Sequence, residues 1–234
     1  MAAGFRVLPH GACEELNARL WRVEGRLPRM VLRRVMTLAR TGRGEIVVHS
    51  AIALEGDLMA RIEAWGKPAW LVVPNGFHRL DAPAFKERYP DLKVLCPRGS
   101  RKKVEQVVAV DGTYEDFPAD PHVRLETLAG TGEREGVMVV ESEGEVSLVF
   151  NDVLFNMPHA PGVAGFVLRA LHVSGGPRVD WAARLLLVKD KGALREHLER
   201  LAALPGLRRI IVSHHEVIDN EPARVLKEVA ATLA

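Results

Sequence analysis

Short runs of apolar residues alternate along this chain with amphipathic segments, and the pattern predicts a mixed α/β protein. Strand-like runs are continuously apolar or alternate with polar residues, whereas helix-like segments place apolar residues three to four positions apart. The predicted strands lie at residues 20–23, 31–39, 45–54, 69–73, 93–96, 123–128, 136–141, 146–150 and 209–213. The predicted helices lie at residues 57–65, 101–108, 163–172, 181–188 and 192–204, and directly after Asp81 and Asn220.

Small polar residues mark three of these helix starts. Asp81 and Asn220 each precede a segment with proline in its first turn, and Ser100 precedes another helical segment. Side chains of this kind accept hydrogen bonds from the free backbone N–H groups at a helix start, where proline is also tolerated. We therefore expect Asp81, Ser100 and Asn220 to act as N-caps.

The order of the predicted elements determines the expected fold class. Each half of the chain has strands followed by helices, and no linker, low-complexity segment or short repeat separates the halves. This order is typical of two sheets packed face to face with helices outside. We predict one domain over residues 1–234, an αββα sandwich of two mixed β-sheets with helices on both outer surfaces.

Composition narrows the function classes. The chain is 47% hydrophobic and 26% charged with a net charge of +2, so nothing global favours nucleic acid or an anionic membrane. The arginine-rich stretch 19–43 has one aromatic residue, Trp21, and therefore lacks a platform for stacking bases. No apolar run reaches the length of about 20 residues that spans a bilayer. Cys13 and Cys96 lie far apart and are expected to be reduced thiols of a cytoplasmic protein.

Candidate chemistry stands where apolar strands end. His78 follows the strand at 69–73, Asp152 follows 146–150, and His214 and His215 follow 209–213. Histidine and carboxylate are suitable ligands for zinc or iron, and the ends of neighbouring strands can converge. Two histidines two or four positions apart, which would be a stronger metal signal, are absent from the sequence.

A glycine-rich segment at residues 130–136 is similar to a phosphate-binding loop. A strand follows it, however, where phosphate binding needs a helix N-terminus. We interpret this segment as a turn between strands.

The order of segments resembles the metallo-β-lactamase superfamily over most of the chain. The His-x-His-x-Asp-His signature of that family is matched in position by residues 74–80, its GD-x-LF segment by 151–155, and its strand closing in GHG by 212–215. The resemblance implies an αββα sandwich with a site at one edge of the two sheets. Members of the family commonly hold one or two metal ions there and hydrolyse esters, amides, thioesters or phosphodiesters.

The sequence departs from the family signature at most ligand positions. Asn75 and Phe77 stand where the first two histidines would be, and residues 79–80 fall at or near the signature aspartate and third histidine. Asp152 and His214 stay in register with the family's ligands. The comparison with the family implies that the usual dinuclear centre cannot be assembled.

Two functions follow from these residues, and a third and least favoured one, a nucleic-acid enzyme, rests on the arginine-rich stretch and on the nuclease branches of the family that the sequence resembles. The first is a metallo-β-lactamase-like protein with a degenerate metal site that binds a small molecule or a partner and needs no cofactor. The alternative is a hydrolase with a remodelled site, either metal-free or holding one zinc or iron ion. Its candidate catalytic and metal-binding residues are His78, Asp152 and His214, and its candidate substrate-binding residues are Asn75, Arg79 and His215.

Further expectations concern the site without an ion and the surface. Asp152 should then stabilise a protonated imidazole, which raises the histidine pKa and lowers the aspartate pKa, and Arg79 should fill part of the vacated volume. At most one metal ion per chain is expected under any loading. A homodimer is compatible with the apolar segment 162–172, which we interpret as a core helix.

Overall fold

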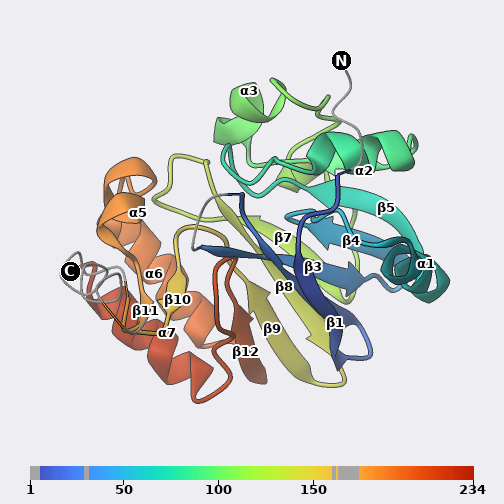
Figure 1. Ribbon diagram of the computed structural model, residues 1–234. Helices are drawn as coiled ribbons and strands as arrows, with labels where there is room; N and C mark the ends of the chain where they lie inside the picture. Colours follow the sequence, from blue (N-terminus) through green and yellow to red (C-terminus); the bar gives the residue numbers. More distant parts are fainter. Residues whose placement is uncertain (1–5, 29–31, 160–161, 163–173) are drawn as a thin grey trace.

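The computed structural model describes residues 6–28, 32–159, 162 and 174–234 (Figure 1). In the described part of the chain, the first sheet has six strands in the order β1-β2-β3-β4-β5-β6 and the second has four in the order β12-β9-β8-β7. The strands of the first sheet are β1 (His10–Asn17), β2 (Leu20–Arg26), β3 (Arg33–Arg40), β4 (Glu45–His49), β5 (Lys67–Val72) and β6 (Lys93–Leu95). Those of the second are β7 (Val123–Thr127), β8 (Gly136–Ser142), β9 (Glu145–Val149) and β12 (Leu207–Ile211).

The remaining described elements are a small ribbon and the helices. The ribbon pairs β10 (Phe155–Met157) with β11 (Gly176–Arg178) in antiparallel fashion. The helices are α1 (Gly56–Trp65), α2 (Ala82–Arg88), α3 (Arg101–Val104), α5 (Trp181–Leu186), α6 (Lys191–Ala202) and α7 (Pro222–Ala231), with single 3₁₀ turns at Arg98–Ser100 and Tyr114–Asp116. The predicted helix at 163–172 lies outside the described residues.

Both sheets are mixed, and they pack face to face. Strands β4, β5 and β6 run parallel to one another, as do β9 and β12, while the other neighbours in the two sheets are antiparallel. Alternate residues point into the space between the sheets, because side chains of a strand alternate between faces. Val35 and Val47 from the first sheet form one buried cluster there with Met138 and Val149 from the second.

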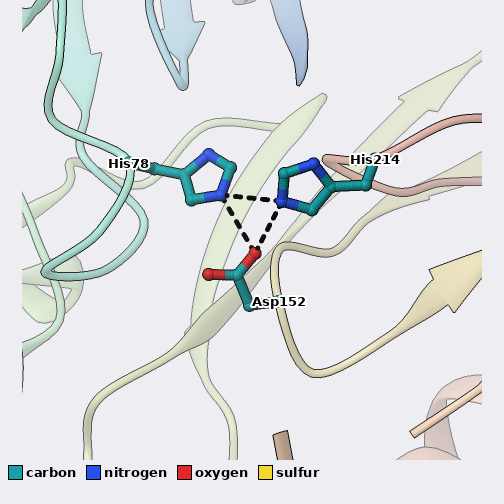
Figure 2. A group of neighbouring side chains, drawn as sticks. All are labelled: His78, Asp152 and His214. Carbon is teal, nitrogen blue, oxygen red and sulfur yellow. Dashed lines mark hydrogen bonds and ion pairs between the residues drawn. The ribbon is translucent and has the colours of Figure 1, made fainter. Parts of the chain in front are cut away.

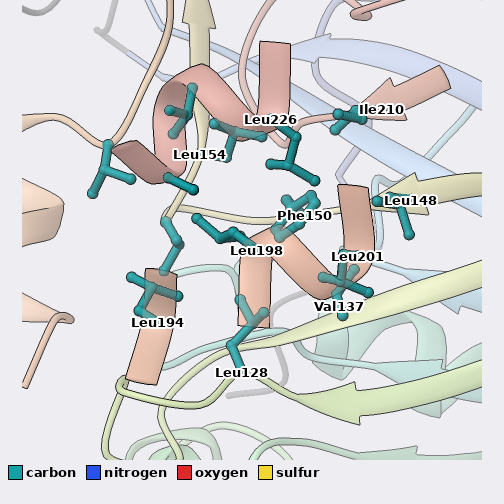
Figure 3. Close-up of a cluster of buried hydrophobic side chains, with 14 of the residues drawn as sticks. Leu128, Val137, Leu148, Phe150, Leu154, Leu194, Leu198, Leu201, Ile210 and Leu226 are labelled. Atoms are coloured by element: carbon teal, nitrogen blue, oxygen red, sulfur yellow. The ribbon is translucent and has the colours of Figure 1, made fainter. Parts of the chain in front are cut away.

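Helices cover the outer face of each sheet, which confirms the predicted αββα sandwich. Figure 3 shows Leu194, Leu198 and Leu201 of α6 in one buried cluster with Leu128, Val137 of β8 and Leu148 of β9, and their spacings place the three leucines on one helix face. On the other side, α1 and α2 pack side chains such as Met59, Ile62 and Phe85 on the first sheet. In Figure 1, α5, α6 and α7 lie together on one side of the strands and α1, α2 and α3 on the other.

The predicted N-caps are wrong at the level of the side chain. The Asp81 carboxylate accepts a hydrogen bond from the Ala53 N–H at 3.0 Å and pairs with Arg34 at 2.7 Å, so it does not bond to its own helix. Ser100 donates its hydroxyl to the Arg134 carbonyl. In each case a partner distant in sequence replaces the local bond.

Two of the predicted helices also begin or end elsewhere. The helix after Ser100 ends at Val104 and not at residue 108, because the chain continues in turns. Glu221, and not Asn220, occupies the N-cap position of α7, with a φ of 48°. No helix among the described residues is long and apolar enough to cross a membrane.

Candidate metal centre

The parallel strands deliver the predicted residues to one edge of the sandwich. Strands β9 and β12 pair in parallel, with Val149 opposite Ile211, so the chain segments that follow them leave the sheet side by side. Asp152 lies in the first of these segments and His214 in the second. His78 lies in the loop after β5 of the facing sheet.

The three side chains converge on one point. Figure 2 shows both imidazoles directed at the same carboxylate oxygen. Asp152 Oδ1 lies 2.9 Å from His78 Nε2 and 3.1 Å from His214 Nε2, and the two Nε2 atoms are 3.2 Å apart. The structure therefore confirms that the three residues lie together, although two come from segments more than 70 residues from the third along the chain.

Asn75 shapes the loop that carries His78. Its Oδ1 accepts hydrogen bonds from the backbone N–H groups of Phe77 at 2.8 Å and His78 at 3.1 Å, as asparagine does in turns. This assignment of the amide directs Nδ2 the other way, where it donates to Glu135 Oε1 at 2.5 Å and Asp152 Oδ2 at 2.7 Å. One buried amide thus turns the loop and bridges two carboxylates.

Glu135 is a residue of the site that the sequence reasoning missed. It belongs to the glycine-rich segment interpreted as a plain turn, and it is fully buried beneath Asp152. Its carboxylate accepts hydrogen bonds from the backbone N–H groups of Asp152 and Val153, both at 3.1 Å, and from the side chains of Asn75 and Asn151. An acidic residue within that glycine-rich segment was the one signal for it, and that signal is weak.

The Nδ1 atom of His214, which faces away from the cluster, has a partner that determines the tautomer of the ring. His214 Nδ1 lies 2.6 Å from the Arg33 carbonyl oxygen, which can only accept, so Nδ1 carries a proton. In neutral His214 the lone pair is consequently on Nε2 and faces the cluster. His78 Nδ1 lies 3.0 Å from Ser50 Oγ. An outer N–H bonded to a backbone carbonyl is the usual arrangement of a metal-ligating histidine.

Backbone conformations of positive φ flank the cluster. Ser50, which contacts His78, has a φ of 59°, and His215, which follows His214, has a φ of 71°. Residues other than glycine adopt this region at a cost of order 1–3 kcal/mol and do so more often at functional sites. The surrounding structure holds both turns in place.

Charges within the cluster shift its pKa values in the expected directions. Burial by itself would raise the pKa of Asp152, but the charge of His78 and the hydrogen bonds from both imidazoles hold it well below its ordinary value. Burial would lower the pKa of His214, but Asp152 and the Arg33 carbonyl raise it above its ordinary value. Burial and the charge of Asp152 raise the pKa of Glu135.

The donor set fits one metal ion. Adjacent ligand atoms lie about 3.0 Å apart around an octahedral ion and about 3.4 Å apart around a tetrahedral one, for bond lengths near 2.1 Å. The three distances of 2.9, 3.1 and 3.2 Å lie closest to the octahedral value. In the residues that the structure describes, this is the one group of three or more His, Cys, Asp or Glu side chains with that ability.

The three predicted substrate-binding residues lie in different surroundings. Asn75 is buried and holds carboxylates. The Arg79 guanidinium donates to the Lys103 carbonyl and to Gln106 Oε1, so the expectation that it fills a vacated metal volume is wrong. His215 is buried next to the cluster, and burial together with the charges of His214 and Arg33 lowers its pKa to about 4.

A pocket of about 430 Å³ opens beside the cluster. His78, Asp152 and His214 line one part of it, together with Arg34 and Ser50. Most of the remaining wall is apolar and comes from the segments around Leu27 and Leu32 and from α5. A concave, mainly apolar site with a few convergent polar groups is the usual form of a small-molecule site.

Comparisons with known proteins give matches among solved structures. No family model and no curated protein matches this sequence. A metallo-β-lactamase from Pontibacter korlensis superposes with a TM-score of 0.63 at 10% identity, covering 94% of this chain and 98% of that one. The metallo-β-lactamase FIM-1 from Pseudomonas aeruginosa, in its mono-zinc form, gives 0.59 at 12% identity, covering 97% and 96%. The DIM-1 metallo-β-lactamase gives 0.63 at 10% identity, covering 98% and 100%.

Proposed function

Because the chain has the metallo-β-lactamase fold over nearly its whole length, we propose that it is a hydrolase that holds one zinc or iron ion between His78, Asp152 and His214. The observation that carries the proposal is the convergence of these three side chains, with His214 fixed in the tautomer that directs a lone pair inward. When bound there, such an ion supplies Lewis acidity, which polarises a carbonyl or phosphoryl oxygen.

The surroundings of Asp152 favour one ion over two. Its Oδ1 faces both imidazoles, whereas its Oδ2 accepts a hydrogen bond from Asn75 and is directed at the buried amide. A two-metal site places its ions about 3.5–4 Å apart and needs further ligands on the second ion. Asn75 and Glu135 already bond to each other at that side.

The residues of the chain have separate tasks in this proposal. The two imidazoles and Asp152 bind the ion, and the Arg33 carbonyl and Ser50 orient the imidazoles from outside. Glu135 orients Asp152 through its backbone N–H. The apolar wall of the pocket keeps the local dielectric low, which strengthens the attraction of the site for a cation.

A metal-free binding protein is the second candidate, and one observation favours it. Asp152 is already paired with both imidazoles, so the cluster is electrostatically satisfied when His214 is protonated. In that case the pocket would bind a ligand without hydrolysing it.

Metal content separates the two candidates. The protein is purified without chelator or affinity tag, loaded with zinc or iron(II), and analysed for metal by mass spectrometry. We expect one ion per chain after loading, lost in Asp152→Ala and retained in the control Glu126→Ala, whose carboxylate lies elsewhere. Two ions per chain, or the same content in both variants, would contradict the proposal, and no ion in the wild type would favour the metal-free binding protein.

Activity is then tested on the loaded protein. A panel of aryl esters, thioesters and phosphodiesters is assayed with and without a chelator. We expect hydrolysis of at least one class that requires the ion and is lost in His214→Ala. Loaded protein that hydrolyses none of them would contradict the hydrolase assignment.

A further inference from the structure

We propose that the pocket beside the cluster binds a linear acyl group, which makes the substrate class an apolar acyl ester and its acid product a fatty acid. The reaction part of this inference rests on the proposed hydrolase, while the binding part rests on the walls of the pocket. Hydrolysis adds water across the acyl C–O bond and gives the carboxylic acid and the alcohol. No further co-reactant is therefore needed.

Exposed apolar side chains gather at the rim of the pocket. Phe77, Leu80 and Leu186 line it, although they are 55%, 52% and 50% exposed. Single apolar residues on a surface are ordinary, but a group of them around a cavity marks a binding site. Phe77 and Leu80 come from the loop between β5 and α2 that carries His78, and Leu186 comes from α5, so two separate segments of the chain contribute to the rim.

The apolar surface continues from the rim into the pocket. Leu27 and Leu32 are half-buried and Leu187 is buried, and all three line the same cavity. A volume of about 430 Å³ lies in the range of small-molecule sites. A wall of this composition is complementary to a hydrocarbon chain and offers it few hydrogen-bond partners.

A polar end of the pocket suits the oxygen atoms of an acyl group. Besides the cluster, Arg34 lines the cavity while being 4% exposed. Its Nη2 lies 2.7 Å from Asp81 Oδ2. A guanidinium has five N–H donors, so Arg34 keeps donors for a carbonyl or carboxylate oxygen. The head of the ligand then lies beside the cluster and its chain extends toward the rim.

Binding of fatty acids to metal-free protein tests this assignment. Hexanoate, octanoate and decanoate are titrated calorimetrically in the presence of a chelator, together with decanol. We expect the affinity to rise about fourfold for each methylene added, and decanoate to bind more tightly than decanol. No binding, or no dependence on chain length, would overturn the acyl site, and equal affinity for decanol would overturn the role of Arg34. Because no metal is present, these outcomes are independent of the proposed hydrolase.

Neighbouring leucines of α5 supply a matched pair of variants. Leu186 lines the pocket, whereas Leu185 is 68% exposed and is not part of the lining. We expect Leu186→Asp to weaken decanoate binding about tenfold or more, because a charge then faces the chain. Leu185→Asp should bind as the wild type does. Equal affinities of the two variants would show that the hydrocarbon chain of the ligand does not contact α5. Leu80→Asp tests the other segment of the rim in the same way, and it should also weaken decanoate binding.

Discussion

Two carboxylate–histidine clusters of this protein have similar side chains and different environments. In the first, Asp152 meets His78 and His214 at the edge of the sandwich. In the second, Glu126 of β7 lies 3.4 Å from His197 of α6 on the outer side of the second sheet. The residue types alone do not distinguish the two clusters, since each pairs a carboxylate with histidine.

The Nδ1 atoms of His214 and His197, which face away from their carboxylates, have different hydrogen-bond partners. His214 Nδ1 faces the Arg33 carbonyl and must donate, which leaves the Nε2 lone pair for the cluster. His197 Nδ1 accepts from the Ala129 N–H at 3.1 Å, so neutral His197 carries its proton on Nε2 and offers it to Glu126. A backbone carbonyl thus leaves neutral His214 with a lone pair directed at its carboxylate, and a backbone N–H leaves neutral His197 with an N–H directed at its carboxylate.

Fixed charge is the second difference. Arg124 and Arg200 both pair with Glu126, which supplies the positive charge that the carboxylate needs. Among the described residues, Asp152 forms ion pairs only with the two histidines, since Arg34 pairs with Asp81 and Arg79 donates to Gln106. An acid–histidine group is therefore a candidate cation site when no arginine side chain pairs with its carboxylate.

Removal of Glu135, which lies beneath the first cluster, and of Glu126, the carboxylate of the second, should give the largest difference in stability. Glu135→Ala leaves the N–H groups of Asp152 and Val153 and two amides without their buried acceptor, so we expect a loss of at least about 3 kcal/mol in the free energy of unfolding. Glu126→Ala should lose about 1 kcal/mol, because its ion pairs lie near solvent. Urea denaturation measures both, and similar losses would remove the contrast.

Metal binding should stabilise the protein through the first cluster alone. Zinc at about 100 times its dissociation constant stabilises a folded protein by about 2.7 kcal/mol. We expect this gain in the wild type and in His197→Ala, and its absence in His214→Ala. Urea denaturation with zinc and with chelator measures the gain. A gain that survives in His214→Ala would place the ion elsewhere.

Acid should weaken the second cluster by a smaller amount. The hydrogen bond from His197, opposed by burial and assisted by Arg124 and Arg200, holds the pKa of Glu126 below its ordinary value. A depressed carboxyl pKa stabilises the fold above the unfolded value of about 4.3, and the stabilisation is lost as the pH falls further. The stability difference between the wild type and Glu126→Gln should therefore shrink below about pH 4. A difference that stays constant from pH 7 to acid would argue against an ionised, paired Glu126.

Periodicity along the chain was sufficient to predict the layers and, to within two residues, the ends of the three strands that precede the site, although it missed β1 and placed the end of β4 at residue 54. Apolar alternation identified the strands that end before His78, Asp152 and His214, and helical spacing identified α6 with its Leu194 and Leu198. These features depend on neighbours within a few residues, because the period of a strand or helix is a local property. The convergence of Asp152 and His214 followed from the rule that neighbouring parallel strands end at the same edge, whereas His78 comes from the facing sheet and was placed beside them by the family resemblance.

Only the tertiary structure decided the partners of the polar side chains. Glu135 is buried because the chain that follows β9 passes over it and because Asn75, 60 residues away in sequence, donates a hydrogen bond to it. The residues next to Glu135 in sequence do not predict either contact. Asp81 bonds to Ala53 and Arg34 and not to its own helix for the same reason. The sequence by itself determined which faces are apolar and where strands end, since both are set by local spacing. Hydrogen-bond partners and tautomers depend on atoms that meet only after the two sheets have packed together.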